Sequence, residues 1–468
     1  MNSEVRFAPP TRRAGRRRPS LLPGLIRHHR DIRLPAGSGS WRRRWADHRF
    51  DQYNRLLALV LCANLAVLGA AIWHLDWFRA DGIDLAALNA MAVINLAAAV
   101  LIRQQRVINL LFRLATAVPH RVPLAIRAKF GKVYHFGGLH SGGALAASVW
   151  FAVLAIASTW QWSHGLPGAS ASVVALSWML VALLAAIVVT ALPRMRARWH
   201  DLFERMHRFG GWSSLALFWL HSWAAFRASA PQATPAAWLT SPGTWALAIV
   251  TLSVISPWWR LRRVPVEIAR PSTHVALTRF DHGVTPFAGS ATAISRNPLL
   301  EWHSFANVPT PGRDGFRLTI SRAGDWTGRF IDDRPSHVWV RGIPTAGVGN
   351  VDKLFRRVVW VATGSGIGPA LPHLLSGATP AQLVWSTRTP RTTYGDTLVG
   401  EILAAQPNAV IWDTVEQGKP DLVRLAYIAH REFDAEAVIV IANQTLTRQV
   451  VSAMEARGIP AYGAIWDS

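Results

Sequence analysis

Four histidines in the first half of the chain lie in or beside apolar segments long enough for membrane helices. His207 and His221 are fourteen residues apart, close to four helical turns, so both would face one side of a helix, separated by roughly 21 Å. His140, with His135 as its rival, would begin a second helix running in the same direction. Ionisable groups inside membrane helices are costly and are therefore functional candidates. This pattern would allow His140 and His207 to ligate a heme b iron.

A second, outer heme would need another histidine about four turns after His140, where Leu154 stands instead. His164 lies too far along the helix to replace it. Alternatively, the histidines bond backbone carbonyls or lipid phosphates. The nearby glycines, such as Gly142 and Gly210, would then serve close helix packing rather than a macrocycle.

A glycine turn near the end of the chain could bind a phosphate group. The stretch VVWVATGSGIGP, residues 358–369, reads as a buried strand, a turn and the start of a helix. Without side chains at the glycines, the backbone can approach a pyrophosphate, and the helix N-terminus adds N–H donors. A purely structural strand-to-helix turn is the alternative. The candidate binding residues are Thr363, Gly364, Ser365, Gly366, Gly368 and Pro369.

Two kinds of element surround this turn. Residues 264–346 alternate apolar and polar positions between Gly/Pro turns, which predicts a small antiparallel β-barrel. Residues 355–468 alternate apolar runs with helical segments, which predicts an α/β domain with a parallel sheet.

The region 55–259 predicts a six-helix transmembrane bundle, because spanning the hydrocarbon core takes about 20 apolar residues per helix. The connections at 103–132, 194–208 and 260–263 are rich in Arg and Lys, whereas the others are not. Basic loops stay on the cytoplasmic side. We therefore expect a multi-pass protein of the cell (inner) membrane with cytoplasmic N- and C-termini. The expected spans are 55–73, 83–102, 139–160, 171–192, 211–226 and 241–259.

The chain of 468 residues has a formal net charge of +23, much of it on an N-terminal arm and on loops beside the expected spans. Membrane lipids are nearer partners for this charge than nucleic acid, so nucleic-acid binding is not expected. Residues 1–54 are predicted to be a basic, disordered cytoplasmic arm. The single cysteine, Cys62, excludes disulfides within the chain and cysteine-ligated metal clusters.

The order of these segments resembles a known architecture. A β-barrel followed by the GSGIGP strand and further parallel strands is similar to the FAD and NAD(P)H module of ferredoxin reductases. Placed behind six spans with histidines, it resembles the ferric reductase and NADPH oxidase superfamily over residues 55–468. The resemblance is strongest in LLEWHSFANV (299–308), SRAGDWT (321–327) and VATGSGIGP (361–369). YHFGG and the IWDS ending faintly resemble a TmpA-like group of fungal integral-membrane flavoproteins.

The resemblance implies roles for particular residues. His303 and Phe305 would contact the flavin, although Ser304 and Ala306 replace the family's Pro and Thr. Gly324 and Thr327 would approach the FAD phosphates. Trp466 would stack on the flavin as a catalytic residue, or alternatively be a core tryptophan. The expected contacts to the adenosine 2′-phosphate of NADPH are Ser386, Arg388, Arg391 and Tyr394. The Cys-Gly-Pro motif of the nicotinamide pocket is replaced by Ala442, Asn443 and Gln444.

These expectations describe an oxidoreductase that passes electrons from cytoplasmic NADPH or NADH through FAD, and through an inner heme b, to an unknown electron acceptor. The replaced motifs leave an alternative from another class. In that alternative, the chain is a membrane-anchored sensor or regulatory protein with a degenerate reductase module and no turnover. A transporter is disfavoured because charged residues are scarce inside the spans.

Overall fold

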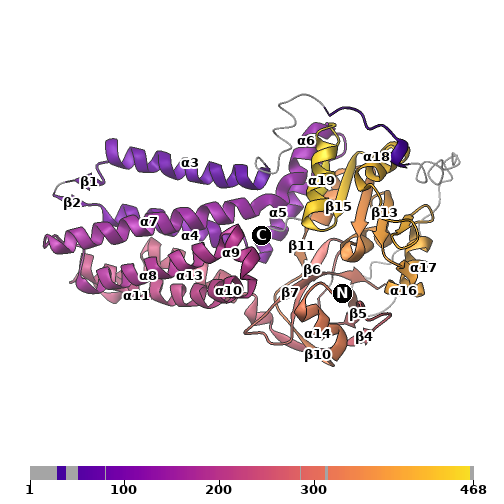
Figure 1. Ribbon diagram of the computed structural model, residues 1–468. Helices are drawn as coiled ribbons and strands as arrows, with labels where there is room; N and C mark the ends of the chain where they lie inside the picture. Colours follow the sequence, from indigo (N-terminus) through magenta and orange to yellow (C-terminus); the bar gives the residue numbers. More distant parts are fainter. Residues whose placement is uncertain (1–28, 38–50, 80, 285, 311–314, 464–468) are drawn as a thin grey trace, which may run out of the picture.

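The chain has a helical half and a sheet-containing half that lie end to end (Figure 1). The structure, a computed structural model, describes residues 29–37, 51–79, 81–284, 286–310 and 315–463. The predicted N-terminal arm lies largely outside these residues, and so does Trp466. Within the arm, a short 3-10 turn, η1 (His29–Asp31), begins the described chain.

The six apolar segments all contain helices, because their Ala-, Leu- and Val-rich runs contain few residues that disfavour helix. Several begin at side-chain caps, as where Asp51 accepts from Asn54 N at 2.9 Å. Helix α7 packs closely against its neighbours: a Cβ at Gly142 would lie 2.9 Å from Val60 Cβ of α3. The helices are α3 (Gln52–Trp73), α4 (Leu85–Leu101), α7 (Gly137–Ser163), α8 (Ala171–Ala191), α11 (Gly211–Ser229) and α13 (Pro242–Ile255).

Only some of these helices are long and apolar enough to cross a membrane. In the described residues three qualify, namely α3, α8 and the continuous stretch Leu124–Ser163 that contains α7. A fourth qualifies if α4 and α5 (Gln105–Thr116), bent by 72°, are counted as one span. With 17 and 14 residues, α4 and α13 alone are shorter than the roughly 20 residues that a span needs. The bundle of six helices therefore contains fewer candidate spans than the sequence predicted.

The basic connection 103–132 is not a simple loop. It forms α5, α6 (Leu124–Phe130) and the start of η3 (Gly131–Phe136). Apolar residues at helical spacing give α5 a buried face, with Ile108 7% and Phe112 3% exposed. This face packs against the sheet-containing half, near β11 and η6. Shorter elements complete the helical half: β1 (Phe78–Arg79), β2 (Gly82–Ile83), α9 (Pro193–Arg198), α10 (His200–Arg205), the π-turn η4 (Met206–Gly210), α12 (Pro235–Leu239) and η5 (Trp258–Arg260).

The strand pairing shows that the prediction of a closed barrel is wrong. In the described residues the strands form two separate antiparallel sheets, ordered β11-β6-β10-β3, with β7 on β6, and β4-β5-β9-β8, rather than one closed barrel. Helix α14 (Asp325–Asp333) follows β9. The strands are β3 (Arg262–Pro265), β4 (Glu267–Ala269), β5 (Val275–Phe280), β6 (Ser290–Ser295), β7 (His303–Ala306), β8 (Val308–Pro309), β9 (Phe316–Ser321), β10 (His337–Val340) and β11 (Thr345–Ala346).

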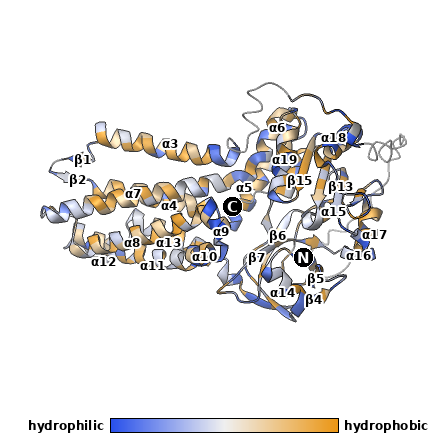
Figure 2. Ribbon diagram, viewed as in Figure 1, coloured by the Kyte–Doolittle hydropathy of each residue, from blue (hydrophilic) through white to orange (hydrophobic). Residues whose placement is uncertain are grey.

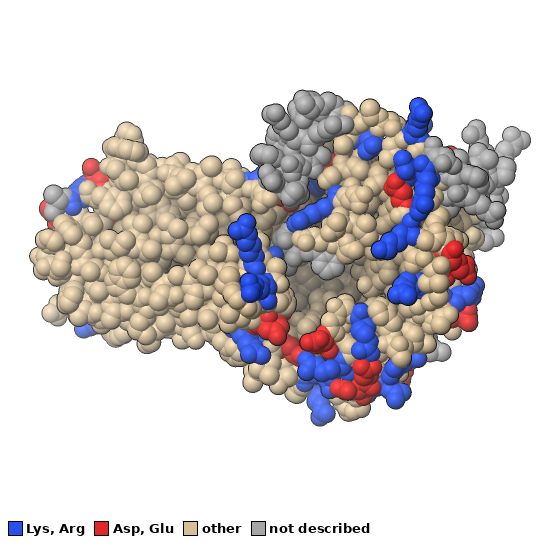
Figure 3. Space-filling view, viewed as in Figure 1, with Lys and Arg blue, Asp and Glu red and all other residues tan. Residues whose placement is uncertain are grey.

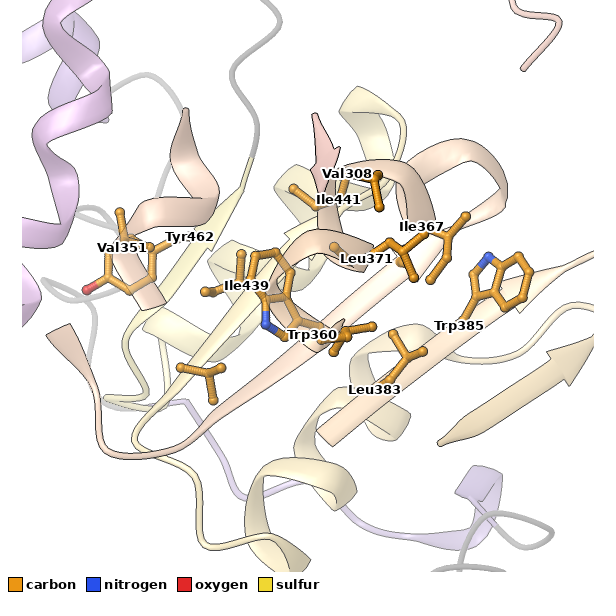
Figure 4. Close-up of a cluster of buried hydrophobic side chains, with 14 of the residues drawn as sticks. Val308, Val351, Trp360, Ile367, Leu371, Leu383, Trp385, Ile439, Ile441 and Tyr462 are labelled. Carbon is orange, nitrogen blue, oxygen red and sulfur yellow. The ribbon is translucent and has the colours of Figure 1, made fainter. Parts of the chain in front are cut away.

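The C-terminal part is a five-stranded parallel sheet in the order β14-β13-β12-β15-β16, preceded by η6 (Val348–Leu354). Its strands are nearly all apolar because helices and the antiparallel sheets cover them. Figure 4 shows Trp360, Leu371 and Ile439 in this core. The strands are β12 (Val358–Thr363), β13 (Ala381–Thr387), β14 (Val410–Asp413), β15 (Ala437–Ile441) and β16 (Ala461–Gly463). The helical elements are η7 (Gly364–Gly366), α15 (Ile367–Ser376), α16 (Pro390–Tyr394), α17 (Asp396–Ala405), α18 (Leu422–Glu432) and α19 (Gln444–Glu455).

Candidate functional site

The glycine turn links β12 to α15 at the centre of the parallel sheet. Gly364 has φ +48°, in the left-handed region that favours glycine, and its carbonyl accepts from Trp385 Nε1 at 3.0 Å. A Cβ at Gly366 would overlap the carbonyl oxygen of Ile441, so this glycine is required by the neighbouring strand β15. At Gly368 a Cβ would make only ordinary contact with Thr319. Part of the glycine pattern therefore comes from packing rather than from a ligand.

A large pocket opens beside this turn, at the carboxyl ends of β12, β13 and β14 and the start of α19. Its volume is about 1010 Å³. The chain order reverses between β12 and its two neighbours, β13 and β15, and ligands of open α/β sheets bind at such a switch point. The lining residues are His274, Thr363, Gly364, Ser386–Thr389, Thr393, Tyr394, Thr414, Lys419, Pro420, Leu422 and Asn443–Leu446.

The lining of this pocket suits an anion. It contains Arg388 and Lys419, both exposed, together with His274 and several hydroxyl groups, but no carboxylate among the described residues. Ser386 is 6% exposed, and within the described chain its hydroxyl forms no hydrogen bond to protein. The N-terminus of α19 also faces the pocket, where Asn443 caps the backbone N–H of Leu446 at 3.0 Å. Phosphate and ribose groups match this combination of cations and hydroxyls.

The antiparallel sheets close one side of the pocket. His274 comes from the start of β5, and the hydroxyl of the nearby Ser272 donates to the carbonyl of Thr393 at 2.7 Å. A second contact between the two parts is the ion pair of Arg317 with Glu401. The pocket is therefore a crevice between the sheets and the α/β part.

The structure separates the four residues predicted to bind a 2′-phosphate. Ser386 and Arg388 line the pocket. Arg391 instead pairs with Asp396 at 2.7 Å and does not line it. Tyr394 touches the pocket, but it is only 1% exposed and its ring packs edge-on against Trp385 at 5.0 Å. Burial raises the pKa of Tyr394, and the nearby hydroxyls of Ser321 and Thr387 oppose this effect.

In the glycine turn, Thr363 and Gly364 line the pocket, whereas Ser365, Gly366, Gly368 and Pro369 do not. Sequence reasoning missed His274 and Lys419, and it noted Asn443 only as a departure from a motif. Lys419 follows the third parallel strand in a Gly-Lys-Pro turn. The position of Lys419 after the carboxyl end of a parallel strand could have indicated a binding residue. His274 comes from an antiparallel strand, where no such sequence pattern points to a binding site.

The predicted flavin residues form an aromatic stack on β7 and α14. The His303 ring stacks on Trp326 with centroids 4.1 Å apart, and Phe305 stacks on the same indole at 6.1 Å. Trp326 is 8% exposed, so it fills the space between these rings and the core. His303 Nε2 is buried and has no hydrogen-bond partner in the described chain. Burial lowers the pKa of His303, while Glu301 opposes the shift.

The start of α14 provides the second part of the predicted flavin site. Thr327 Oγ1 accepts from Ala323 N at 2.9 Å and from Gly324 N at 3.1 Å, so this hydroxyl is used to cap the helix. At Gly324 the backbone is extended and a Cβ would meet nothing within 4 Å. Neither packing nor backbone conformation therefore requires glycine there. The open space at Gly324 and the His303 Nε2, which lies 4.0 Å from Glu301 Oε2 and forms no hydrogen bond among the described residues, fit a flavin nucleotide.

The loop before β7 is held by the helical half. Arg208 bonds the carbonyl of Leu300, and the Arg341 guanidinium lies 4.1 Å from the Trp302 ring and 4.7 Å from the Trp258 ring. Burial lowers the pKa of Arg341 to about 10. The candidate flavin site thus sits directly against the end of the bundle.

Of the four predicted heme ligands, the structure brings only His140 and His207 together, with ring centroids 6.2 Å apart. His140 Nδ1 bonds the carbonyl of Ala99 at 2.8 Å, which leaves Nε2 available. His221 bonds Ser177 Oγ at 3.0 Å, and His135 packs on Tyr134.

Helix packing accounts for glycines on α7 near this pair. A Cβ at Gly138 would collide with the backbone of Tyr53, and one at Gly143 would lie 3.0 Å from Asn95 O. The space beside these two glycines is therefore filled by neighbouring helices, whereas a Cβ at Gly211 would meet nothing within 4 Å. The described residues also contain no group of three or more His, Cys, Asp or Glu that could hold a metal ion.

Comparison with known proteins gives relatives over most of the chain. It is 42% identical over 421 residues to adenylate-forming reductase 06235 of Coprinopsis cinerea, and 43% identical over 426 residues to adenylate-forming reductase 03009 of the same fungus. Each match covers 90% of this chain but only 40% of the relative. A family model described as the C-terminal domain of adenylate-forming reductase 03009 matches residues 348–468, the part that contains the pocket.

Solved structures give weaker similarities. A ferredoxin-NADP+ reductase of Neisseria gonorrhoeae with bound FAD and NADP has 11% identity and a TM-score of 0.34, covering 44% of this chain and 98% of that one. A flavohemoglobin of Malassezia yamatoensis with bound FAD and heme has 16% identity and a TM-score of 0.39, covering 81% of this chain and 98% of that one. TM-scores as low as these support no conclusion about the fold or the ligands of this chain. What relates this chain to known proteins is its sequence similarity to adenylate-forming reductases.

Proposed function

We propose that this chain is an oxidoreductase that binds a nicotinamide nucleotide in the large pocket and FAD against the antiparallel sheets. The observation that carries the proposal is the pocket of about 1010 Å³ at the carboxyl ends of the parallel strands, lined by cations and hydroxyls without a carboxylate in the described residues. The relatives named as reductases support it.

Each residue would have a defined task. Arg388 and Lys419 would neutralise phosphate charge, and the buried Ser386 hydroxyl would orient a ribose. Gly324 would let the flavin phosphates approach α14, while His303 would hold the ring system near Trp326. When bound, FAD would accept a hydride and release electrons singly. The protein would position the two nucleotides across the crevice and exclude water.

We further propose that the helical half lies in a membrane, with the sheet-containing half on the cytoplasmic side. Its outer surface is apolar: Leu65 is 66% exposed and Ile94 61%. Figure 2 shows predominantly hydrophobic helices there, and Figure 3 shows charged residues at the junction, on the other half and at the far end of the helices, with few in between. Apolar surface on this scale matches lipid better than water. The electron acceptor would then be reached from the membrane side.

A regulatory protein without turnover is the second candidate. It is favoured by the Ala442–Gln444 segment, where the Asn443 side chain caps α19 and no thiol faces the pocket. Binding of both nucleotides without electron transfer would be its signature.

The visible absorption of the detergent-purified, FAD-supplied chain tests these proposals, before and after anaerobic NADPH. A flavin band that bleaches supports the oxidoreductase. A flavin band that persists while NADPH binds would favour the regulator, and the absence of both ligands would refute the proposal. No Soret band is expected, because helix packing already accounts for the glycines Gly138 and Gly143 beside His140. A Soret band removed by His140→Ala would overturn that expectation.

A further inference from the structure

A segment from the beginning of the chain lies on the nucleotide-binding part. In Figure 1 the indigo segment that contains η1 runs beside α18, although nearly 400 residues separate them in sequence. His29 is 3% exposed, and its ring meets Trp412 edge-on at 5.0 Å. His29 Nε2 accepts from the backbone N–H of Asp421 at 3.2 Å. A buried ring with a directed hydrogen bond fixes this segment in place.

Further along, Leu34 packs against the apolar cluster that contains Trp412, Leu422 and Val423. The segment is therefore anchored at both ends, on the loop after β14 and on α18. This loop carries Lys419, a lining residue of the large pocket.

The anchoring brings Arg30 to the pocket. Its Nη2 donates to the carbonyl of Lys419 at 2.9 Å, and within the described residues its side chain makes no other hydrogen bond. A second cavity of about 300 Å³ lies here, and four of its lining residues also line the large pocket, so the two cavities are adjacent. Its lining is Arg30, Lys419, Pro420, Asp421, Leu422, Arg424, Leu446 and Gln449.

The charge of this cavity is positive. Arg30, Lys419 and Arg424 contribute three cations. The carboxylate of Asp421 pairs with Arg424 at 3.2 Å, so it does not neutralise the other two. Lys419 lines both cavities and makes no ion pair within the described chain, so its ammonium group is available to an anion in either. Two unpaired cations at the end of a pocket suit a phosphate monoester.

The strand order places this cavity at one end of a bound nucleotide. In α/β sheets the pyrophosphate lies at the first glycine turn and the adenosine ribose near the end of the next strand. Here these are the ends of β12 and β13, and β14 lies beyond β13. The loop after β14 is therefore at the adenosine end.

We propose that the N-terminal segment completes this pocket, with Arg30 and Lys419 as a subsite for a phosphate monoester on the adenosine ribose. This inference rests on the proposed nucleotide site and deepens it. It makes preference for a phosphorylated dinucleotide depend on a residue from the opposite end of the chain.

Calorimetric titration of the full-length chain in detergent tests this assignment, with adenosine 2′,5′-bisphosphate and adenosine 5′-monophosphate as probes. Arg30→Ala should weaken bisphosphate binding about tenfold, the typical loss for one charge-assisted hydrogen bond, and should change monophosphate binding less than twofold. Lys419→Ala should weaken the binding of both probes, and that of the bisphosphate more, because Lys419 lines both cavities. His29→Ala should show the same selectivity as Arg30→Ala, by releasing the segment.

Arg33→Ala is the matched control, because Arg33 lies on the same segment, is exposed and does not line either cavity. Equal bisphosphate affinities of Arg30→Ala and Arg33→Ala would overturn the subsite while leaving the proposed function intact. If wild-type protein bound neither probe nor NADPH, the proposed function itself would fail. Inorganic phosphate that binds in an Arg30-dependent manner, with unchanged nucleotide selectivity, would show a free-anion site and would also overturn the proposal.

Discussion

Gly366 offers a sharp test of how the glycine turn is built. An alanine Cβ there would overlap the carbonyl oxygen of Ile441 and lie 2.9 Å from its carbonyl carbon. The contact with the oxygen is the tighter one, so α15 or β15 would have to move by roughly 1 Å or more. Both atoms belong to the backbone of buried β15, and overpacking of this kind costs about 3 kcal/mol. For a unit of about 200 residues, that lowers Tm by roughly 6–12 °C.

Differential scanning fluorimetry of Gly366→Ala in detergent would measure this shift, and titration with NADPH would measure the loss of affinity as the turn moves. Gly400→Ala is the matched control. Gly400 lies exposed within α17, where a Cβ meets nothing within 4 Å, so alanine should stabilise the helix by about 0.5–1 kcal/mol. If Gly366→Ala unfolded within 1 °C of wild type, with unchanged NADPH affinity, the packing argument would be wrong.

Three further outcomes are expected. Arg388→Ala should raise the KM for NADPH about tenfold and the KM for NADH much less. Arg391→Ala should leave both KM values near wild type, because Arg391 pairs with Asp396. Equal effects of the two substitutions on the KM for NADPH would refute the assignment of Arg388 to the pocket. The hydrogen bond from Arg127 lowers the pKa of Glu436 below its ordinary 4.5. The pair therefore stabilises the fold above pH 4.5 and loses this contribution as the pH falls through the lowered pKa. Glu436→Gln should flatten the acid limb of a curve of Tm against pH, and an unchanged limb would count against this role of the pair. Asn95→Leu breaks an amide pair between α3 and α4 and should cost about 1–2 kcal/mol in detergent unfolding, whereas a gain in Tm would contradict the role of that pair.

The parallel sheet could be predicted because each of its central strands is an unbroken apolar run. VVWVAT and AVIVI admit few other interpretations once helices flank them. The two antiparallel sheets could not be told from a barrel, since alternation identifies strands but not whether the outer strands pair to close the sheet. The helices of the connection 103–132 were harder still to predict, because its many arginines made the segment read as a basic loop although Ile108 and Phe112 form a buried face.

The site was predictable only where a residue follows directly from a strand. Ser386 and Arg388 come at the end of β13, so the strand pattern located them. Lys419 and His274 come from loops whose paths depend on tertiary contacts. Tyr394 and Arg391 fit a motif by spacing, yet one is buried on Trp385 and the other is engaged by an acidic neighbour. Spacing says which residues are near a strand end but not which way their side chains turn.

The packing of α5 and η3 on the sheet-containing half has a practical consequence for any attempt to produce that half alone. A fragment that began at β3 would lose Ile108, Phe112 and Tyr134, which are part of the same buried cluster as Trp360 and Leu371. At about 1.5–3 kcal/mol for each buried side chain, the loss would approach the whole stability of a typical domain. The minimal autonomous unit therefore includes residues from within the helical half, between α4 and α7, and joining residues 105–136 to 262–463 by a linker is the rational starting point.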